Sequence, residues 1–192
     1  MRLRFPLTKM ANFNAVFPLL AGHEGGISRN PNDNAAAVPA PGTNGAHTNK
    51  GVTWTTFVSH ASKLHYEATP MLFLQMPDAI VKQIAKMTYW NPLKLDEINT
   101  NKKAYILFDF SFNSGPSNAI KVTQKALRIP VDGAAGPQFV KTINALSEDN
   151  FAEIASEARK GFITNSGRIA NVLKPGLVAR VDLVAKKKFA LS

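Results

Sequence analysis

The sequence predicts a mainly α-helical protein. Three observations predict this class: apolar residues recur at helical spacing in several segments, clusters of Gly, Pro, Asn and Asp separate those segments, and no repeat period is present. A chain of 192 residues suits one domain or two closely packed lobes, and it can bury roughly two-thirds of its unfolded surface. The chain has no cysteine, so the fold must hold without disulfides.

A first helix is expected upstream of Gly25-Gly26, a pair that ends it because glycine tolerates the left-handed backbone conformation. Apolar residues recur there at i, i+3, i+4 and i+7, and Glu24 continues the same face. Pro18 lies inside this stripe, so the helix must kink or begin there. The stripe consists of Phe13, Val16, Phe17 and Leu20.

Three further helices are predicted in the first lobe. Thr53 can cap the first, because its side chain can accept a hydrogen bond from a backbone N–H of the first turn. Pro77-Asp78 opens the second, and Asn91-Pro92 ends it. The third, residues 104–112, is apolar almost all round, as expected for the central helix of an α-helical core.

A second helical lobe is expected after residue 115. Residues 131–137, Val-Asp-Gly-Ala-Ala-Gly-Pro, predict a turn between two helices, because glycine allows positive φ and Pro137 suits the first turn of the next helix. Two later segments, 147–162 and 176–191, carry apolar stripes that pack this lobe. The predicted lobes are therefore residues 1–115 and residues 116–192.

Two carboxylic acids in contrasting surroundings are the candidates for catalysis. Glu24 shares an apolar helix face, where a carboxyl loses hydration and its pKa rises. Asp33 lies nine residues later in the polar segment Arg29–Asn34, where a carboxylate stays ionised. A proton donor beside an anion is what cleavage of a glycosidic bond requires. The alternative is that Glu24 is an ordinary helix-end acid and Asp33 a turn residue.

The residues around these carboxylates resemble the family-108 glycoside hydrolases, N-acetylmuramidases once labelled secretion activators. The resemblance covers nearly the whole chain beyond the first ten residues. Three family aromatic positions differ, being Ile27, Lys50 and Leu177 here, and residues 35–46 are extra. The similar segments are Glu24-Gly25-Gly26, Asn32-Asp33, Thr48–Thr53, Tyr89-Trp90, Phe108-Asp109-Phe110, Asn113-Ser114-Gly115 and Gly176–Val181.

The resemblance implies a lysozyme-like helical bundle with a small β-hairpin or loop wing. Residues 35–46, rich in Ala, Pro and Gly, either enlarge that wing or form a disordered surface insertion. The implied reaction is hydrolysis of the β-1,4 bond between N-acetylmuramic acid and N-acetylglucosamine. Glu24 would be the general acid, Asp33 would activate or orient water, and Thr48 would hold that water, which favours inversion.

The same resemblance places Asn49 and four later residues beside the substrate. Core packing or structural hydrogen bonding is the alternative for those four, because they lie in apolar segments. Residues 124–137 resemble a peptidoglycan-binding motif, with a simple turn between helices as the alternative. The predicted substrate-binding set is Asn49, Tyr89, Trp90, Asp109 and Asn113.

The formal net charge of +10 predicts attraction to a polyanion, and peptidoglycan fits as well as nucleic acid or an anionic membrane. Nucleic acid is not expected, since basic residues interleaved with aromatics and known helix motifs are absent. No apolar run approaches the ~20 residues of a membrane span. No cofactor or metal is expected, because Ile27 replaces the second histidine of a His-Glu-x-x-His zinc motif.

We expect a monomer that acts at the cell wall or periplasm. No secretory signal is evident at the first residues, so prophage-type release or assisted export is expected, and otherwise the protein stays in the cytoplasm. Two other classes stay open. One is a non-catalytic wall-binding or secretion-associated protein with a lysozyme-like fold, and the other is a polyanion-binding protein.

Overall fold

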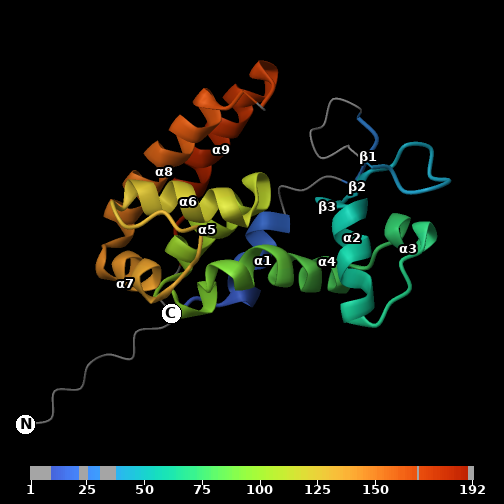
Figure 1. The fold of residues 1–192 in the computed structure, drawn as a ribbon, viewed down its shortest axis with the longest axis horizontal. Helices are drawn as coiled ribbons and strands as arrows, with labels where there is room; N and C mark the ends of the chain where they lie inside the picture. Colours follow the sequence, from blue (N-terminus) through green and yellow to red (C-terminus); the bar gives the residue numbers. More distant parts are fainter. Residues whose placement is uncertain (1–9, 22–25, 31–37, 168, 190–192) are drawn as a thin grey trace, which may run out of the picture. The chain divides into compact units, whose positions relative to one another are not determined.

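The computed structural model describes residues 10–21, 26–30, 38–167 and 169–189, which are mainly helical with one small sheet (Figure 1). The predicted class, mainly α with a small β wing, is confirmed. The chain divides into two compact units: residues 17–88, and residues 1–16 together with 89–192. None of the helices in the described ranges is long and apolar enough to cross a lipid bilayer.

Helix α1 spans Phe13–Ala21 and contains Pro18 in its interior. Its start is fixed by Asn12, whose side-chain oxygen accepts hydrogen bonds from the backbone N–H groups of Asn14 (2.8 Å) and Ala15 (3.3 Å). The helix therefore begins well before the proline instead of at it. The predicted extension of its apolar face to Glu24 lies outside the described residues.

The unit of residues 17–88 contains a three-stranded antiparallel sheet in the order β1-β2-β3. Lys50 and Gly51 join β2 to β3 with φ values of 48° and 76°. Positive φ at both central residues characterises a two-residue type I′ hairpin, which fits the right-handed twist of the strands. The strands are β1 (Ile27–Ser28), β2 (Thr48–Asn49) and β3 (Val52–Thr53).

Residues 38–46 lie in the connection from β1 to β2 and are held by buried small residues. Ala40 and Ala46 are buried, and the hydroxyl of buried Thr43 donates to the carbonyl oxygen of Ala40 at 2.6 Å. The backbone N–H of Ala40 also donates to the carbonyl of Ala46 at 2.8 Å. This described part of the extra segment is therefore an anchored loop of the wing.

Helices follow the sheet in the sequence and form most of the core of this unit. The N-cap predicted at Thr53 is confirmed, since its hydroxyl accepts the backbone N–H of Thr56 at 3.1 Å. The core of this unit consists of apolar side chains from β3 and the helices, including the fully buried Phe57 and Phe73. The helical elements are α2 (Trp54–Ala61), a 3-10 turn (Ser62–Leu64), α3 (Pro70–Leu74) and α4 (Asp78–Ala85).

The second unit is built around helix α5 (Asn101–Ser114), whose residues 103–111 are all buried. This confirms the central helix predicted over residues 104–112. Thr100 caps it, accepting the backbone N–H of Lys103 at 3.4 Å, and Gly115 with φ 81° ends it. Helices α6 (Pro116–Ala126), α8 (Glu148–Asn165) and α9 (Lys174–Lys186) pack against it.

Shorter elements complete this unit. Helix α7 spans Pro137–Ala145, and α9 starts at Lys174 instead of the predicted residue 176, because Pro175 suits the first turn. Helices α5 and α6 pack against each other on either side of residue 115, and the boundary between the compact units lies at residues 88 and 89 instead. A functional division between residues 115 and 116 stays a prediction. A π-helix spans Lys86–Trp90, where the sequence passes from one unit to the other, and 3-10 turns occur at Asn91–Leu93, Leu95–Glu97 and Asn171–Leu173.

Candidate functional site

The described part of the predicted catalytic region is the small sheet. Glu24 and Asp33 themselves lie outside the described residues. Strand β1 begins soon after Glu24 and pairs with β2, so that Ser28 lies opposite Thr48 and Ile27 opposite Asn49. The pairing extends one step further, because the N–H of Lys50 donates to the carbonyl of Gly26 at 3.2 Å. Thr48 is therefore fixed against the strand that follows the Glu24 segment.

Thr48 is half-buried, and its hydroxyl contacts the imidazole of His47. The His47 Nδ1 lies 3.0 Å from Thr48 Oγ1, and Nε2 lies 3.1 Å from the carbonyl oxygen of Asn30. His47 is only 2% exposed. Sequence reasoning missed this residue, because a single histidine beside a threonine carries no periodic or spacing signal. The only available signal was its position next to Thr48.

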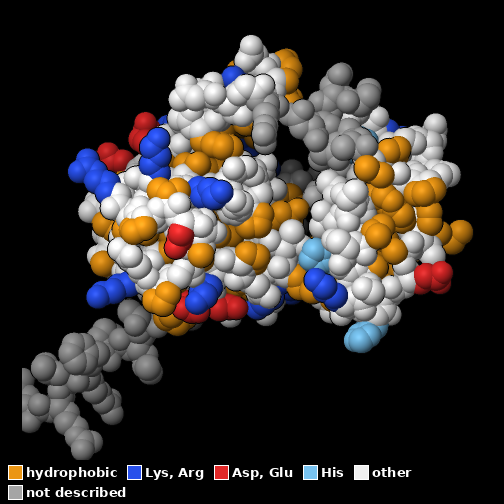
Figure 2. All heavy atoms as spheres, in the orientation of Figure 1, with side chains coloured by type: hydrophobic (Ala, Val, Ile, Leu, Met, Phe, Trp, Pro, Cys, Tyr) orange, Lys and Arg blue, Asp and Glu red, His pale blue; other side chains and the backbone are white. Residues whose placement is uncertain are grey.

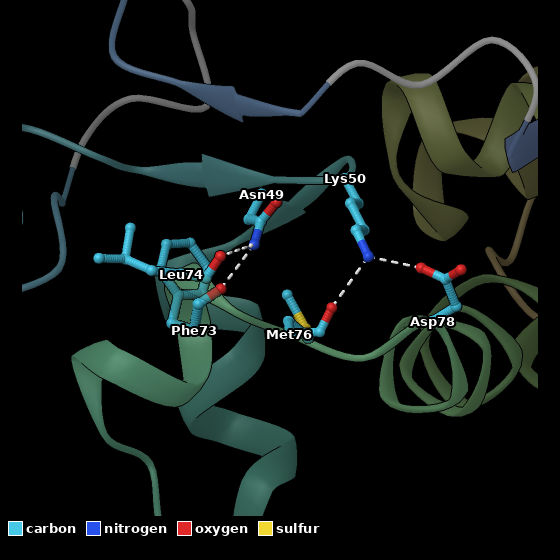
Figure 3. A network of polar contacts seen from close by, with 6 residues as sticks. All are labelled: Asn49, Lys50, Phe73, Leu74, Met76 and Asp78. Atoms are coloured by element: carbon cyan, nitrogen blue, oxygen red, sulfur yellow. Dashed lines mark hydrogen bonds and ion pairs between the residues drawn. The ribbon is translucent and has the colours of Figure 1, made fainter.

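Side chains of the β2–β3 hairpin tie it to the segment between α3 and α4 (Figure 3). Asn49 Nδ2 donates to the carbonyl oxygens of Phe73 at 2.6 Å and Leu74 at 3.1 Å. Lys50 Nζ donates to the carbonyl of Met76 at 3.0 Å and pairs with the Asp78 carboxylate. The amide of Asn49 is buried, so its role in the described structure is to hold the hairpin that carries Thr48.

Two other members of the predicted substrate-binding set are buried in the second unit. The Trp90 side chain is fully buried, and its indole Nε1 donates to Asp96 Oδ1 at 2.9 Å. The carboxylate of Asp109 is also fully buried. The burial and internal hydrogen bonds of Asn49, Trp90 and Asp109 favour structural roles for these side chains, and their contact with substrate stays a prediction.

Tyr89 and Asn113 are the members of that set which reach the surface. Tyr89 is half-buried with its ring centroid 4.8 Å from that of Phe112. Asn113 is exposed, and its Nδ2 donates to the carbonyl of Asp109 one helical turn earlier at 2.7 Å. For these two residues a contact with substrate stays a prediction.

Asp109 is the acceptor at the centre of a buried ionic cluster. Its Oδ2 accepts from Arg159 Nη1 at 2.6 Å, and its Oδ1 lies 2.7 Å from Arg180 Nη2. Burial lowers the pKa of Arg159, an effect that the Asp109 charge opposes. Burial, followed by the Asp109 charge, raises the pKa of Tyr105 to about 12. The cluster ties α5 to α8 and α9.

The Asp-Gly-Ala-Ala-Gly turn is held by Gln124 of α6. Gln124 Nε2 donates to Asp132 Oδ1 at 2.6 Å and to the carbonyl of Ala134 at 2.9 Å, while its Oε1 accepts the N–H of Gly133 at 3.0 Å. Gly133 has φ 77°, so the positive φ predicted here is confirmed at this glycine. The backbone N–H of Ala134, followed by the Gln124 amide, lowers the pKa of Asp132.

A pocket of about 640 Å³ opens beside this turn. Backbone and small side chains of the turn form one wall, and the start of α6 forms another. The pocket lies entirely within the second unit. Its lining residues are Asn91, Pro92, Lys94, Pro116, Ser117, Ile120 and residues 133–136.

Basic side chains are spread over the surface instead of forming one patch on the face seen in Figure 2. In that view Lys and Arg residues lie singly over the unit that contains α5–α9, with Asp and Glu among them. On this face the positive charge is therefore spread out and not gathered in one patch. A diffuse positive field attracts polyanions without selecting one of them.

Comparison with known proteins identifies the family. The sequence matches Glycosyl hydrolase 108 over residues 17–115, more than half of the chain. This chain belongs to the glycosyl hydrolase 108 family. The resemblance inferred from the motifs is thereby confirmed over residues 17–115, and the enzyme class is that of a glycosyl hydrolase. The match ends before the Asp-Gly-Ala-Ala-Gly turn, so a peptidoglycan-binding role for that region stays a prediction.

A solved structure with the same fold is that of Brucella abortus SagA. The two chains share 22% sequence identity with a TM-score of 0.72, over 90% of this chain and 91% of the other. At 22% identity this similarity shows that the two chains share a fold, and nothing about function is concluded from it. A search among curated protein sequences found no match.

Proposed function

We propose that this glycosyl hydrolase is a lysozyme-type N-acetylmuramidase that cleaves the β-1,4 bond between N-acetylmuramic acid and N-acetylglucosamine in peptidoglycan. Membership of the glycosyl hydrolase 108 family supports the reaction class. The net charge of +10 favours a carboxylate-rich polymer as substrate, because opposite charges raise the local concentration of the partner.

In this proposal Glu24 donates a proton to the leaving oxygen, and Asp33 orients the attacking water together with Thr48. An inverting outcome is expected, because a water held between acid and base requires carboxyl groups roughly 6.5–9.5 Å apart. The observation that carries the assignment is the pairing of Ser28 with Thr48. It places Ser28, which follows Glu24 by four residues in the sequence, directly opposite Thr48.

We also propose that the pocket beside residues 133–136 binds the wall polymer. Two hydrogen bonds donated by Gln124 and one that it accepts hold the turn in one conformation, and a preformed site loses little entropy on binding. Exposed Lys94 on the pocket wall, whose Nζ lies 3.9 Å from a Glu97 carboxylate oxygen, would pair with carboxylates of the polymer. Residues 116–192 would then retain the enzyme on its substrate while the first lobe cleaves it.

The protein is proposed to act as a monomer at the cell wall or periplasm, after assisted export or prophage-type release. A non-catalytic wall-binding or secretion-associated protein is the alternative function, supported by the substitutions at Ile27, Lys50 and Leu177.

The decisive variant is Glu24→Gln, which removes the transferable proton and keeps the size of the side chain. Near-complete loss of lysis of purified peptidoglycan is expected, with the wild-type melting temperature retained. Glu67→Gln is the matched control, because Glu67 is an exposed glutamate of the same unit. Unchanged turnover in the Glu24 variant would exclude Glu24 as the acid, and absence of turnover in the wild type would favour the non-catalytic alternative.

A further inference from the structure

The backbone N–H and carbonyl groups of His47 both form hydrogen bonds, in addition to the contacts of its ring. Its N–H donates to the carbonyl of Ser28 at 3.2 Å, and its carbonyl accepts the N–H of Trp54 at 2.9 Å. The residue is almost completely buried. Both ring nitrogens lie within hydrogen-bond distance of an oxygen atom, one of Thr48 and one of Asn30, and these contacts together with burial hold the ring in one orientation.

The two contacts define which nitrogen carries the hydrogen in the neutral ring. The carbonyl oxygen of Asn30 can only accept, so Nε2, at 3.1 Å, must be the protonated nitrogen. Nδ1 is then an acceptor, and the hydroxyl of Thr48 at 3.0 Å must donate to it. The opposite tautomer would set the Nε2 lone pair against a carbonyl oxygen.

We propose that His47 is a positioning residue that fixes the Thr48 hydroxyl as a hydrogen-bond acceptor for the attacking water. This inference rests on the proposed function, in which Thr48 contacts that water. With its own hydrogen committed to His47 Nδ1, the Thr48 oxygen offers lone pairs to the water. His47 thus acts through Thr48 and does not itself contact the substrate.

The chemistry of water attack explains why an acceptor is needed. A water that attacks a sugar carbon must direct one lone pair at that carbon, so its hydrogens are best held by acceptors. A hydroxyl with a free hydrogen could instead donate to the water and occupy the attacking lone pair. Fixing the rotor of Thr48 removes that competing arrangement before substrate binds.

Two amide substitutions separate the two ring contacts. The short side chain introduced by His47→Asn brings an amide oxygen near the position of Nδ1, so this variant retains an acceptor for Thr48. The longer side chain introduced by His47→Gln brings its amide near the position of Nε2, so this variant retains a donor for the Asn30 carbonyl and loses the acceptor. If His47 only holds the chain at Asn30 against the sheet, His47→Gln should retain more activity than His47→Asn. If His47 orients Thr48, His47→Asn should retain more activity.

The experiment measures kcat and KM on soluble peptidoglycan fragments for both variants, alone and combined with Thr48→Val. We expect His47→Gln to lower kcat roughly tenfold, the effect of one misdirected hydrogen bond, with KM unchanged. His47→Asn should lose less. In the Thr48→Val background His47→Gln should add no further loss, because the hydroxyl that it orients is already gone.

An equal loss from His47→Gln in both backgrounds would overturn the inference, as would a better activity of the glutamine variant than of the asparagine variant. Nitrogen-15 NMR of the imidazole gives a readout independent of turnover: a protonated Nε2 and an unprotonated Nδ1 are expected, and the reverse tautomer would overturn the inference. Wild-type turnover with an inert Thr48→Val substitution would remove Thr48 from the mechanism and with it the role of His47. A wild-type protein without any turnover would overturn the proposed function itself.

Discussion

Asp109 on α5 and Arg159 on α8 form a fully buried ion pair, with 2.6 Å between Oδ2 and Nη1. The guanidinium of Arg180 shares the same carboxylate, so one anion faces two cations. The Arg159 guanidinium also lies 5.2 Å from the centroid of the Phe110 ring. This cluster sets the packing of the central helix.

Removing the anion from this cluster should destabilise the protein strongly. Asp109→Ala removes the carboxylate that the buried Arg159 guanidinium pairs with, at an expected cost of about 3–5 kcal/mol in the free energy of unfolding. Urea denaturation measures the change. Asp149→Ala is the control, since Asp149 pairs with Lys102 at an exposed site and should have little effect. A loss no larger than the control would show that the cluster does not hold the fold.

The second carboxylate should be less critical than the first. Asp33→Asn removes the anion and keeps an amide of similar size, so substrate binding should survive while kcat falls by roughly 10²-fold, less than for Glu24→Gln. Turnover and binding of peptidoglycan fragments measure the two effects separately. Wild-type turnover in Asp33→Asn would mean that Asp33 is only a turn residue.

The turn beside the pocket should lose stability in acid. The pKa of Asp132 is lowered in the folded protein by the backbone N–H of Ala134 and then by Gln124, so its contribution is present above its ordinary pKa of 3.8 and is lost as pH falls through the lowered value. The melting temperature of Asp132→Ala should therefore lie below that of the wild type at pH 7. The difference should shrink below pH 3.8, and a difference independent of pH would contradict this account.

Filling the pocket should weaken retention on the wall without changing catalysis. Ala134 is exposed on the pocket wall, so Ala134→Trp should occlude the site. Co-sedimentation with insoluble peptidoglycan should show roughly tenfold weaker binding, the loss of about 1.4 kcal/mol, while turnover of soluble fragments stays unchanged. Val172→Trp, at a position 84% exposed, is the control. Equal binding by both variants would remove this pocket from the account.

Local sequence patterns predicted the helices well because their causes are local. The helix predicted from the apolar run over residues 104–112 and the N-cap predicted at Thr53 both depend on residues that are close in sequence. Contacts over long separations leave no such pattern. The Asp109–Arg159 pair joins residues 50 positions apart, and nothing around Arg159 distinguishes it from a surface arginine in the sequence.

The candidate site was predictable to a similar extent. Family resemblance suggested Thr48 as a catalytic residue, and in the structure Thr48 pairs with Ser28 of strand β1. The same resemblance suggested Asn49 and Trp90 as substrate contacts, which stays a prediction; in the structure both side chains are buried and form internal hydrogen bonds. Residues adjacent to a motif share its sequence signature whether they face the cleft or support the fold. His47 is recognised only from the distances between its ring and two segments.

The sugar at the new reducing end of the product identifies the bond that the enzyme cleaves. Purified peptidoglycan is digested, the products are reduced with borohydride, and the terminal sugar alcohol is identified by mass spectrometry. We predict new ends derived from N-acetylmuramic acid in the wild-type digest and none with Glu24→Gln. Ends derived from N-acetylglucosamine, or an equal yield from the two proteins, would contradict it.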